Sequence, residues 1–353
     1  MKKVLILAYD FPPYRSVGGL RPAAWFENFK NNGYYPVVVT RQWTPSSGEV
    51  AYISASDYSS VILEKHDHGM LISAPYKPNV SNKLLLRFGV RRFQYARRML
   101  SGITEIAQYF LPLGPKRDVY LAAREYLKKE KVDIILATGD PFVMFHYASL
   151  LSKEFDIPWV ADYRDPWTDG MYLKDKIVLK RIFGRIEQRV VGSTSLISTV
   201  NPFFTQLLSK RHIGKQVVIS ANGFDDRAFT NLEATARSSD GLKMAFVGTI
   251  YDWNPLNEFL NGFLTFLRTN EHRVELLFYG TNKNEEIQLF IDSHQEELRD
   301  SIRVIDSLPN KELIKKLNHV DLLVLFNYFE IIGTKIYDYL ALRKQILFCY
   351  TDY

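Results

Sequence analysis

The stretch DIILATGDPFVMFHYASLLSKEFDIPWVADYRD, residues 133–165, decides the fold of this chain. It starts with a short apolar run at 133–139 and ends with another at 158–165, and both have the length of a buried strand. The segment between them, 141–155, has the length and apolar periodicity of a helix. Nearly continuous apolar strands that alternate with helices indicate a parallel sheet covered on both faces. The stretch therefore predicts a β-α-β unit of an α/β domain.

The same alternation continues on both sides of this unit. In the first part of the chain it predicts further strands at 4–10, 35–40, 195–200 and 217–223 and further helices at 20–33, 179–192 and 203–210. A polar stretch without periodicity, 230–242, then interrupts the pattern. After this stretch we predict strands at 243–248, 274–280, 302–306, 320–327 and 345–350 and helices at 257–269, 285–298, 310–319 and 334–343.

This pattern predicts two tandem Rossmann-like, doubly wound α/β domains, residues 1–228 and 229–353. The chain has 353 residues, 46% of them hydrophobic and 14% aromatic, which is enough to form two cores. No helix follows the last predicted strand, 345–350, so we expect the second domain to be incomplete at its C-terminal end.

Composition also bears on the compartment and on cofactors. The single cysteine, Cys349, excludes an intramolecular disulfide and fits a reducing cytosol. The N-terminal apolar run is too short for a signal peptide, and no apolar run approaches the roughly 20 residues of a membrane span. The His66-Asp67-His68 cluster lacks further ligands at recognisable spacing, so we interpret it as a solvated loop. We therefore expect a cytoplasmic protein that uses no metal and no other cofactor.

Several predicted turns lie where open α/β sheets bind ligands, at the carboxyl ends of the strands. They are Gly18-Gly19, TGDPF at 138–142, DYRDPW at 162–167, Gly248 and Thr249 in FVGTIYDW at 246–253, and Gly280 in FYG at 278–280. The glycine pair matches neither the dinucleotide fingerprint nor the P-loop. Each turn alone also fits an ordinary tight turn, and the charges of 162–165 also fit a structural ion-pair corner. Their recurrence in both domains favours a shared ligand-binding cleft.

The strongest candidate is NYFEIIGTKIYDYLALRKQIL, residues 327–347. If a helix begins near Gly333 and Thr334, its first N–H groups have no partner within the helix. Such groups favour an anion by about 0.3–1 kcal/mol, or by about 2 kcal/mol when they are partly buried. Lys335 adds a full positive charge at the same place. The stretch therefore predicts a phosphate site.

Two acids flank this predicted phosphate site. Asp338 lies too far into the helix for a capping box, and an acid so close to a phosphate is best explained if it faces hydroxyl groups. Hydrogen bonds to a charged carboxylate contribute about 1.5–3 kcal/mol each. With Glu330 on one side and Asp338 on the other, the spacing suits a ligand ordered sugar, diphosphate, ribose, which is the order of a nucleotide-sugar. The alternative is a surface helix whose acids suit its dipole.

Several motifs together resemble the family-4 retaining glycosyltransferases of the E-x7-E type. These motifs are EIIGTKIYDYLA at 330–341, DYRDPW at 162–167, NGFDDRAF at 222–229 and FVGTIYD at 246–252. The resemblance spans nearly the whole chain. It implies the GT-B architecture, in which two Rossmann-like domains face a cleft, with the acceptor on the side of the first domain and the nucleotide-sugar on the second.

The resemblance also implies roles for individual residues. Glu330 would contact the donor sugar, Asp338 the ribose and the turn 333–335 the diphosphate. The catalytic candidates are Glu330, Lys335 and Asp140, of which Asp140 stands where the family often has a histidine. The donor-binding candidates are Gly18, Gly19, Arg164, Gly248, Thr249, Gly280, Gly333, Thr334 and Asp338, and Asp165 is the acceptor-side candidate. The family's Arg and Lys after the first strand of the second domain are missing, which leaves Lys335, with Arg164 or Arg21, to neutralise the diphosphate.

The activity implied is a metal-independent, retaining transfer of a sugar from a UDP- or GDP-linked donor to a glycan or lipid-linked acceptor, in cell-surface polysaccharide or lipopolysaccharide synthesis. Helix N–H groups and Lys335 would stabilise the leaving diphosphate, which would accept the proton of the acceptor. Two alternatives stay open. One is a nucleotide-sugar epimerase or hydrolase on the same fold. The other is a degenerate homologue that binds nucleotide or glycan without catalysis.

Residues 77–98 form a basic segment with seven lysine and arginine residues and no acid, in a chain whose net charge is +6. Leucine, phenylalanine and methionine are interleaved with these cations. A helix over 81–114 would suit an anionic membrane, which fits a lipid-linked acceptor and a peripheral location on the inner face of the membrane. It would equally suit a helix packed on the core with an exposed basic face. We expect no nucleic-acid partner, because no recognised binding motif accompanies the patch.

Overall fold

The computed structural model describes residues 1–45, 48–111, 113–169, 176–230, 232, 241–270, 273–328 and 333–351. Its contacts divide the chain into two compact units, Met1–Ala221 and Asn222–Tyr353, called unit 1 and unit 2 below. The sequence pattern placed the division after residue 228. Each unit is an α/β structure built on a largely parallel sheet, so the predicted fold class is confirmed.

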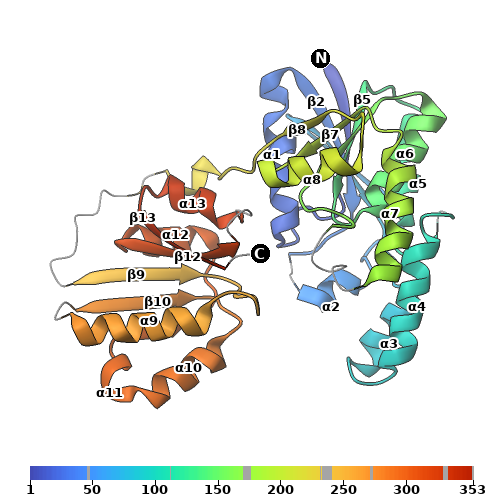
Figure 1. The fold of residues 1–353 in the computed structure, drawn as a ribbon. Helices are drawn as coiled ribbons and strands as arrows, with labels where there is room; N and C mark the ends of the chain where they lie inside the picture. Colours follow the sequence, from blue (N-terminus) through green and yellow to red (C-terminus); the bar gives the residue numbers. More distant parts are fainter. Residues whose placement is uncertain are drawn as a thin grey trace. The chain divides into compact units, whose positions relative to one another are not determined.

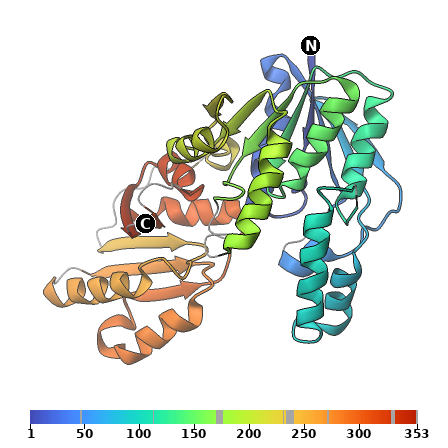
Figure 2. The same ribbon diagram turned by 45° about the vertical axis from the view of Figure 1, so that its right-hand side comes forward.

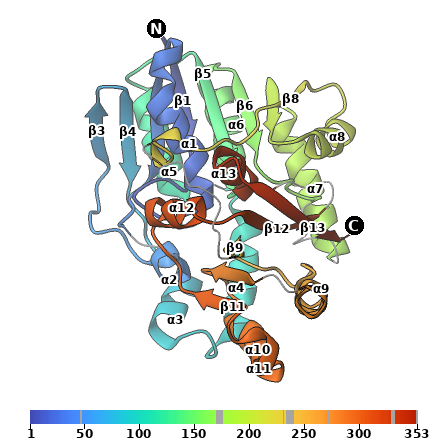
Figure 3. The same cartoon turned by 90° about the vertical axis from the view of Figure 1, so that its left-hand side faces the viewer.

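Unit 1 is built on an eight-stranded sheet in the order β3-β4-β2-β1-β5-β6-β7-β8 (Figure 3). Neighbouring strands run parallel, except that β3 and β4 form an antiparallel hairpin at one edge. The turn of this hairpin contains the His66–His68 cluster, and the ring of His68 packs on Phe26 with 4.6 Å between centroids. The strands are β1 (Lys2–Leu7), β2 (Tyr34–Arg41), β3 (Ile62–His66), β4 (Gly69–Ala74), β5 (Ile134–Gly139), β6 (Trp159–Tyr163), β7 (Leu196–Thr199) and β8 (Val217–Ile219).

Helices cover the two faces of this sheet unequally. On one face, side chains of α5, α6 and α7 pack with Leu5, Ile135 and other strand residues in a large core cluster. On the other face, α1 packs through Phe26 on Val4 and Ile6. The helices are α1 (Val17–Asn28), η1 (Lys30–Asn32), α2 (Gly48–Ile53), α3 (Val80–Phe88), α4 (Gln94–Ala107), α5 (Arg117–Leu127), α6 (Val143–Phe155), α7 (Ile177–Val191) and α8 (Pro202–Arg211). Right-handed crossovers explain the asymmetry, because the chain proceeds from β5 to β8 in one direction.

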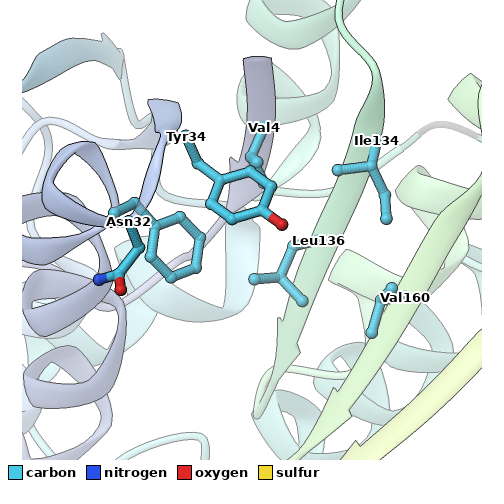
Figure 4. A pocket seen from close by; sticks show the side chains of 7 residues that line it. Val4, Asn32, Tyr34, Ile134, Leu136 and Val160 are labelled. Atoms are coloured by element: carbon cyan, nitrogen blue, oxygen red, sulfur yellow. The ribbon is translucent and has the colours of Figure 1, made fainter. Parts of the chain in front are cut away.

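An apolar pocket of about 260 Å³ lies where the α1 face of the unit 1 sheet is open (Figure 4). Ile134 and Leu136 pack against the α1-side core but are only half-buried there, so this part of β5 is less covered than its continuous apolar run predicts. The residues that line the pocket are Val4, Phe29, Asn32, Tyr34, Ile134, Leu136 and Val160. The strand residues among them lie toward the amino-terminal ends of their strands, at the opposite edge of the sheet from the predicted site.

Unit 2 is built on a five-stranded parallel sheet in the order β11-β10-β9-β12-β13. One face packs on α9, α10 and α11 through Phe246, and the other packs on α12 and α13 through Ala245 (Figures 1 and 2). The strands are β9 (Leu242–Val247), β10 (Val274–Tyr279), β11 (Ile302–Ile305), β12 (Leu322–Tyr328) and β13 (Gln345–Thr351). The helices are η3 (Asp226–Ala228), α9 (Leu256–Thr269), α10 (Asn284–Ser293), α11 (Gln295–Leu298), α12 (Asn310–Asn318) and α13 (Lys335–Ala341).

The structure differs from the sequence prediction in several elements. It adds β3, β4, α2 and α5, which lie in a region where we recognised no alternation. The basic region forms two helices instead of one, because Gly89 and Phe93 take positive φ values of 75° and 58° between α3 and α4. The predicted helix 285–298 divides at His294 into α10 and α11. Most of the polar stretch 230–242 lies outside the described residues. None of the described helices is long and apolar enough to span a membrane.

Candidate functional site

Each unit has one topological switch point, where strand order reverses and open α/β sheets bind ligands. In unit 1 it lies between β1 and β5, because the chain continues from β1 to one side and from β5 to the other. In unit 2 it lies between β9 and β12 for the same reason. The turns 138–142 and 246–253 and the start of α13 follow β5, β9 and β12. These predicted turns therefore lie at the switch point of each sheet.

The Gly18-Gly19 pair lies in the first turn of α1, at the unit 1 switch point. Ser16 caps this helix by accepting a hydrogen bond from the N–H of Gly19 at 3.1 Å, and its hydroxyl donates to Asp10 Oδ2 at 2.8 Å. A Cβ atom on Gly18 would lie 2.3 Å from Nη1 of Arg164 and 2.9 Å from Asp10 Oδ2. Glycine at this position therefore allows a guanidinium and a carboxylate to meet at the helix start.

Several charged side chains act on one another at this switch point, among them Asp10, Asp140, Arg164 and Lys116. Arg164 Nε donates to the carbonyl of Gly139 at 2.6 Å, and Nη2 donates to the carbonyl of Asp140, so Arg164 holds the turn after β5. Desolvation raises the pKa of Asp140, while the charges of Lys116 and Arg164 oppose the rise. Desolvation also raises the pKa of Asp10, opposed by its hydrogen bond from Ser16 and by Arg164. For both acids, desolvation thus raises the pKa and the nearby cations lower it.

Sequence reasoning missed two members of this cluster. Asp10 follows the first apolar run directly, as the charges of DYRDPW follow theirs, but the predicted strand 4–10 includes it. Lys116 stands just before α5, far along the chain from β1, and its ammonium lies 5.7 Å from the centroid of the Tyr9 ring. No local sequence pattern predicts this contact between Lys116 and Tyr9, because it depends on the tertiary fold.

The charges of DYRDPW divide into different roles. Asp162 is fully buried and forms a structural ion pair, but its partner is Arg21 and not Arg164. Because Arg21 donates to both oxygens of Asp162, at 3.1 and 2.8 Å, it is not placed to neutralise a diphosphate, and this part of the sequence interpretation is corrected. Asp165, the acceptor-side candidate, is exposed next to Arg164 in the sequence.

At the unit 2 switch point, Lys335 lies over the turn that follows β9. Gly248 takes a positive φ of 84°, and its N–H donates to the carbonyl of Tyr279 at 2.7 Å. A Cβ atom on Gly248 would lie 2.8 Å from Lys335 Nζ, and this Nζ lies 5.1 Å from the centroid of the Phe246 ring. Burial lowers the pKa of Lys335 to about 8. Within the described part of the chain, no carboxylate lies within ion-pair distance of this ammonium.

Helix α13 begins at Lys335 itself, and no side chain caps it at Thr334. Tyr339 donates to the carbonyl of Val324 at 3.3 Å, which fixes α13 against β12. Asp338 is half-buried in the first turn, and burial raises its pKa. Glu330, the candidate for the donor sugar, lies outside the described residues.

The remaining candidates of unit 2 line tight turns. Gly280 has a φ of 59°, and a Cβ atom there would lie 3.1 Å from the Cα of Ser307, so the turn itself requires glycine. Thr249 is exposed. Where the family often has Arg and Lys, the loop after β9 carries Tyr251 and Trp253, whose rings stack at 4.6 Å with an interplanar angle of 2°. Sequence reasoning noted the missing cations but not this aromatic pair.

No protein-family model matches the sequence, and a search of curated proteins gave no match. Solved structures do match. A sucrose-phosphate synthase from Thermosynechococcus elongatus has a TM-score of 0.63 at 14% identity, covering 99% of this chain and 81% of that one. An alpha,alpha-trehalose-phosphate synthase (UDP-forming) from Burkholderia xenovorans, in complex with glucose-6-phosphate, has a TM-score of 0.60 at 10% identity, covering 99% and 85%. A lipopolysaccharide outer core galactosyltransferase, in its apo form, has a TM-score of 0.55 at 11% identity, covering 99% and 82%. At such identities the likeness concerns the fold, and the chain has the two-domain GT-B fold of these glycosyltransferases.

Proposed function

We propose that the chain is a retaining, metal-independent glycosyltransferase that uses a UDP- or GDP-linked sugar. The acceptor is a glycan or a lipid-linked sugar in the synthesis of cell-surface polysaccharide or lipopolysaccharide. One observation carries the proposal: Lys335 places a desolvated ammonium over the Gly248 turn, at the switch point of the unit 2 sheet and at the start of α13. A half-buried cation without a carboxylate partner among the described residues suits an anionic ligand.

The chemistry of this place suits a nucleoside diphosphate. Lys335 and the first N–H groups of α13 present positive charge to the diphosphate, and the small Gly248 turn lets the phosphate approach the backbone. Asp338, in the first turn of α13, is the acceptor for the ribose hydroxyls, and Glu330 is assigned to the donor sugar. The trehalose-phosphate synthase of the same fold is described as UDP-forming, which supports a uridine nucleotide as the first donor to test.

The transfer itself breaks the bond between the anomeric carbon and the diphosphate oxygen. The acceptor hydroxyl forms the new bond on the same face of the sugar, and its proton passes to the departing phosphate. In the transition state negative charge grows on the diphosphate, and Lys335 stabilises it electrostatically without any rearrangement. In unit 1, Asp140 is the further catalytic candidate and Asp165 the acceptor-side candidate, and Arg164 holds the turn that carries Asp140.

Nucleotide binding and product analysis test this proposal. UDP or GDP is expected to raise the melting temperature in the presence of a chelator, by an amount that corresponds to about 2.7 kcal/mol at one hundred times the dissociation constant. The matching nucleotide-sugar is then expected to be consumed only when an acceptor is added, with the anomeric configuration of the donor retained in the product. A chain that binds neither nucleotide contradicts the proposal. Consumption without an acceptor would instead indicate a hydrolase or an epimerase.

Replacement of Gly248 by alanine is expected to weaken nucleotide binding about tenfold or more. The added Cβ would displace Lys335 Nζ, and the positive φ of 84° adds backbone strain of about 1–3 kcal/mol. Gly214→Ala is the matched control, because Gly214 has a φ of 83° and open space around its Cβ position. Isothermal titration with UDP compares the two variants. Equal affinities in Gly248→Ala, Gly214→Ala and the unmodified chain would remove Lys335 from the nucleotide site.

A further inference from the structure

The hairpin formed by α3 and α4 is an amphipathic element in which almost no residue is fully buried. None of the residues of α4 is buried, and Ser81 is the only buried residue of α3. The two helices lie side by side and extend past the carboxyl-terminal edge of the unit 1 sheet (Figures 1 and 2). A helix of this length normally buries an apolar face against its own protein. The apolar side chains of α4 therefore require another explanation.

Polar contacts connect the two helices. Ser81 Oγ lies 2.7 Å from Ser101 Oγ and donates to the carbonyl of Arg97 at 3.1 Å. Arg97 Nη1 donates to the carbonyls of Gly89 and Val90, each at 3.0 Å, and so closes the turn of the hairpin. Hydroxyls, main-chain carbonyls and one guanidinium thus join the two helices, together with half-buried apolar side chains such as Leu85 and Leu100.

The exposed apolar side chains form a stripe and a tip. Tyr95, Met99 and Ile103 recur at intervals of four residues on α4 and are 77%, 62% and 58% exposed. Residues at this interval share one face of a helix. At the turn of the hairpin, Val90 and Phe93 are 66% and 47% exposed. The hairpin thus presents continuous apolar surface along α4 and at its end.

The segment that forms this hairpin is also strongly basic. The seven lysine and arginine residues of 77–98 form no ion pair with any carboxylate of the described residues, and the segment itself contains no acid. Arg92 lies 5.2 Å from the ring centroid of Phe88 and 5.5 Å from that of Phe93, so charge and aromatic rings occupy the same tip. A nucleic acid would use the cations but leave the apolar stripe exposed. The interface of an anionic bilayer accommodates both.

We propose that the α3–α4 hairpin docks this protein on an anionic lipid bilayer. Val90, Phe93 and the stripe of α4 enter the boundary between headgroups and acyl chains, and the arginines of the tip contact lipid phosphates. The sequence alternative of a helix packed on the core is not what the structure shows, since α4 buries none of its residues. The hairpin joins unit 1 at the edge that carries the switch point, where Asn82 Nδ2 donates to Tyr76 Oη at 2.7 Å. If the proposed function holds, a membrane-bound acceptor would be close to that edge.

Vesicle flotation of the full chain tests the docking surface. Phosphatidylcholine vesicles with phosphatidylglycerol are expected to bind the chain at low salt, and pure phosphatidylcholine vesicles much less. Val90→Asp with Phe93→Asp, Met99→Asp with Ile103→Asp, and Arg91→Glu with Arg92→Glu are each expected to weaken binding about tenfold or more. Leu289→Asp, at a 69% exposed residue of α10, and Lys129→Glu with Lys131→Glu are the matched controls and are expected to bind as the unmodified chain does. Near-ultraviolet circular dichroism checks that each variant is folded.

Several outcomes would overturn the inference. They are an absence of binding to anionic vesicles at low salt, an equal loss in the control variants, and unchanged binding in folded hairpin variants. Tight binding of a nucleic-acid duplex without vesicle binding would also overturn it. Nucleotide affinity measured on the same preparations separates this inference from the proposed function. Vesicle binding that persists in a chain without nucleotide affinity supports the hairpin and rejects only the proposed activity.

Discussion

Replacement of Lys335 by methionine is expected to lower the affinity for UDP or GDP about one hundredfold, and transfer activity at least as much. Methionine keeps an apolar stem of similar length but removes the charge that lies over the Gly248 turn. Removal of one partner from a desolvated pair of charges costs about 2–5 kcal/mol of binding free energy, and each 1.4 kcal/mol is a factor of ten. Isothermal titration with the nucleotide measures the affinity. Lys315→Met, at an exposed lysine of α12, is the matched control and is expected to bind normally.

The melting temperature of the same variant separates a binding role from a structural one. Burial lowers the pKa of Lys335 from 10.5 to about 8. The folded state therefore disfavours the proton, and this destabilisation is fully present below pH 8 and disappears as the pH rises toward 10.5. At pH 7 the methionine variant is expected to melt no lower than the unmodified chain. Lost affinity together with lost stability would mean that Lys335 mainly supports the fold.

The pH dependence of nucleotide binding provides a second readout for Lys335. Below a pH of about 8 its ammonium is charged in the free protein, and the affinity is expected to be constant. Above this pH Lys335 loses its proton in the free protein but keeps it in the complex, next to the diphosphate, so the affinity falls by up to about tenfold per pH unit. The methionine variant is expected to show a flat profile over the same range. A slope that persists without Lys335 would assign the titration to another group.

Much of the fold was readable because it depends on local patterns. Apolar runs such as 133–139 and 158–165 contain the strands β5 and β6 in the structure, and the helix between them is α6. The β3–β4 hairpin was missed because Ile62–His66 is an exposed edge strand, so it lacks the continuous apolar run of a central strand. The division of the basic region into two helices depends on the conformations of Gly89 and Phe93. The sequence does not predict a left-handed backbone conformation at a phenylalanine.

For the candidate site, too, the local sequence predicted individual residues but not the contacts between them. Strand ends that carry glycine or charge are visible along the chain, and they led to Gly248, Asp140 and Lys335. The chain does not show that Lys335 lies over Gly248, because that contact requires β9 and β12 to be neighbours in the sheet. The sequence also does not show which of several cations pairs with a given acid. Arg21 and Arg164 looked alike in the sequence, yet Arg21 alone pairs with Asp162 within the described residues, while Arg164 donates to two carbonyls.

That pairing predicts a large loss of stability when Asp162 is replaced by asparagine. Asp162 is fully buried and accepts hydrogen bonds from two nitrogens of Arg21, from Thr138 at 3.0 Å and from Ser198 at 2.7 Å. Asparagine offers one acceptor oxygen and an NH₂ group that itself needs acceptors, so several buried donors lose their partner. Arg21 also keeps a buried charge without its counter-charge. The expected loss is about 3–5 kcal/mol of the free energy of unfolding.

Urea unfolding followed by tryptophan fluorescence measures this loss, because Trp25, Trp43, Trp159 and Trp167 lie in unit 1 and only Trp253 lies in unit 2. Glu130→Gln is the matched control, since it breaks the ion pair with Lys3 at a similar distance of 2.8 Å but with both side chains exposed. Exposed pairs contribute about 0–1 kcal/mol. A loss in Asp162→Asn no larger than in Glu130→Gln would mean that the Arg21 charge finds water or another partner. The unit 1 site would then be looser than its geometry indicates, and Arg21 would again be available to an anionic ligand.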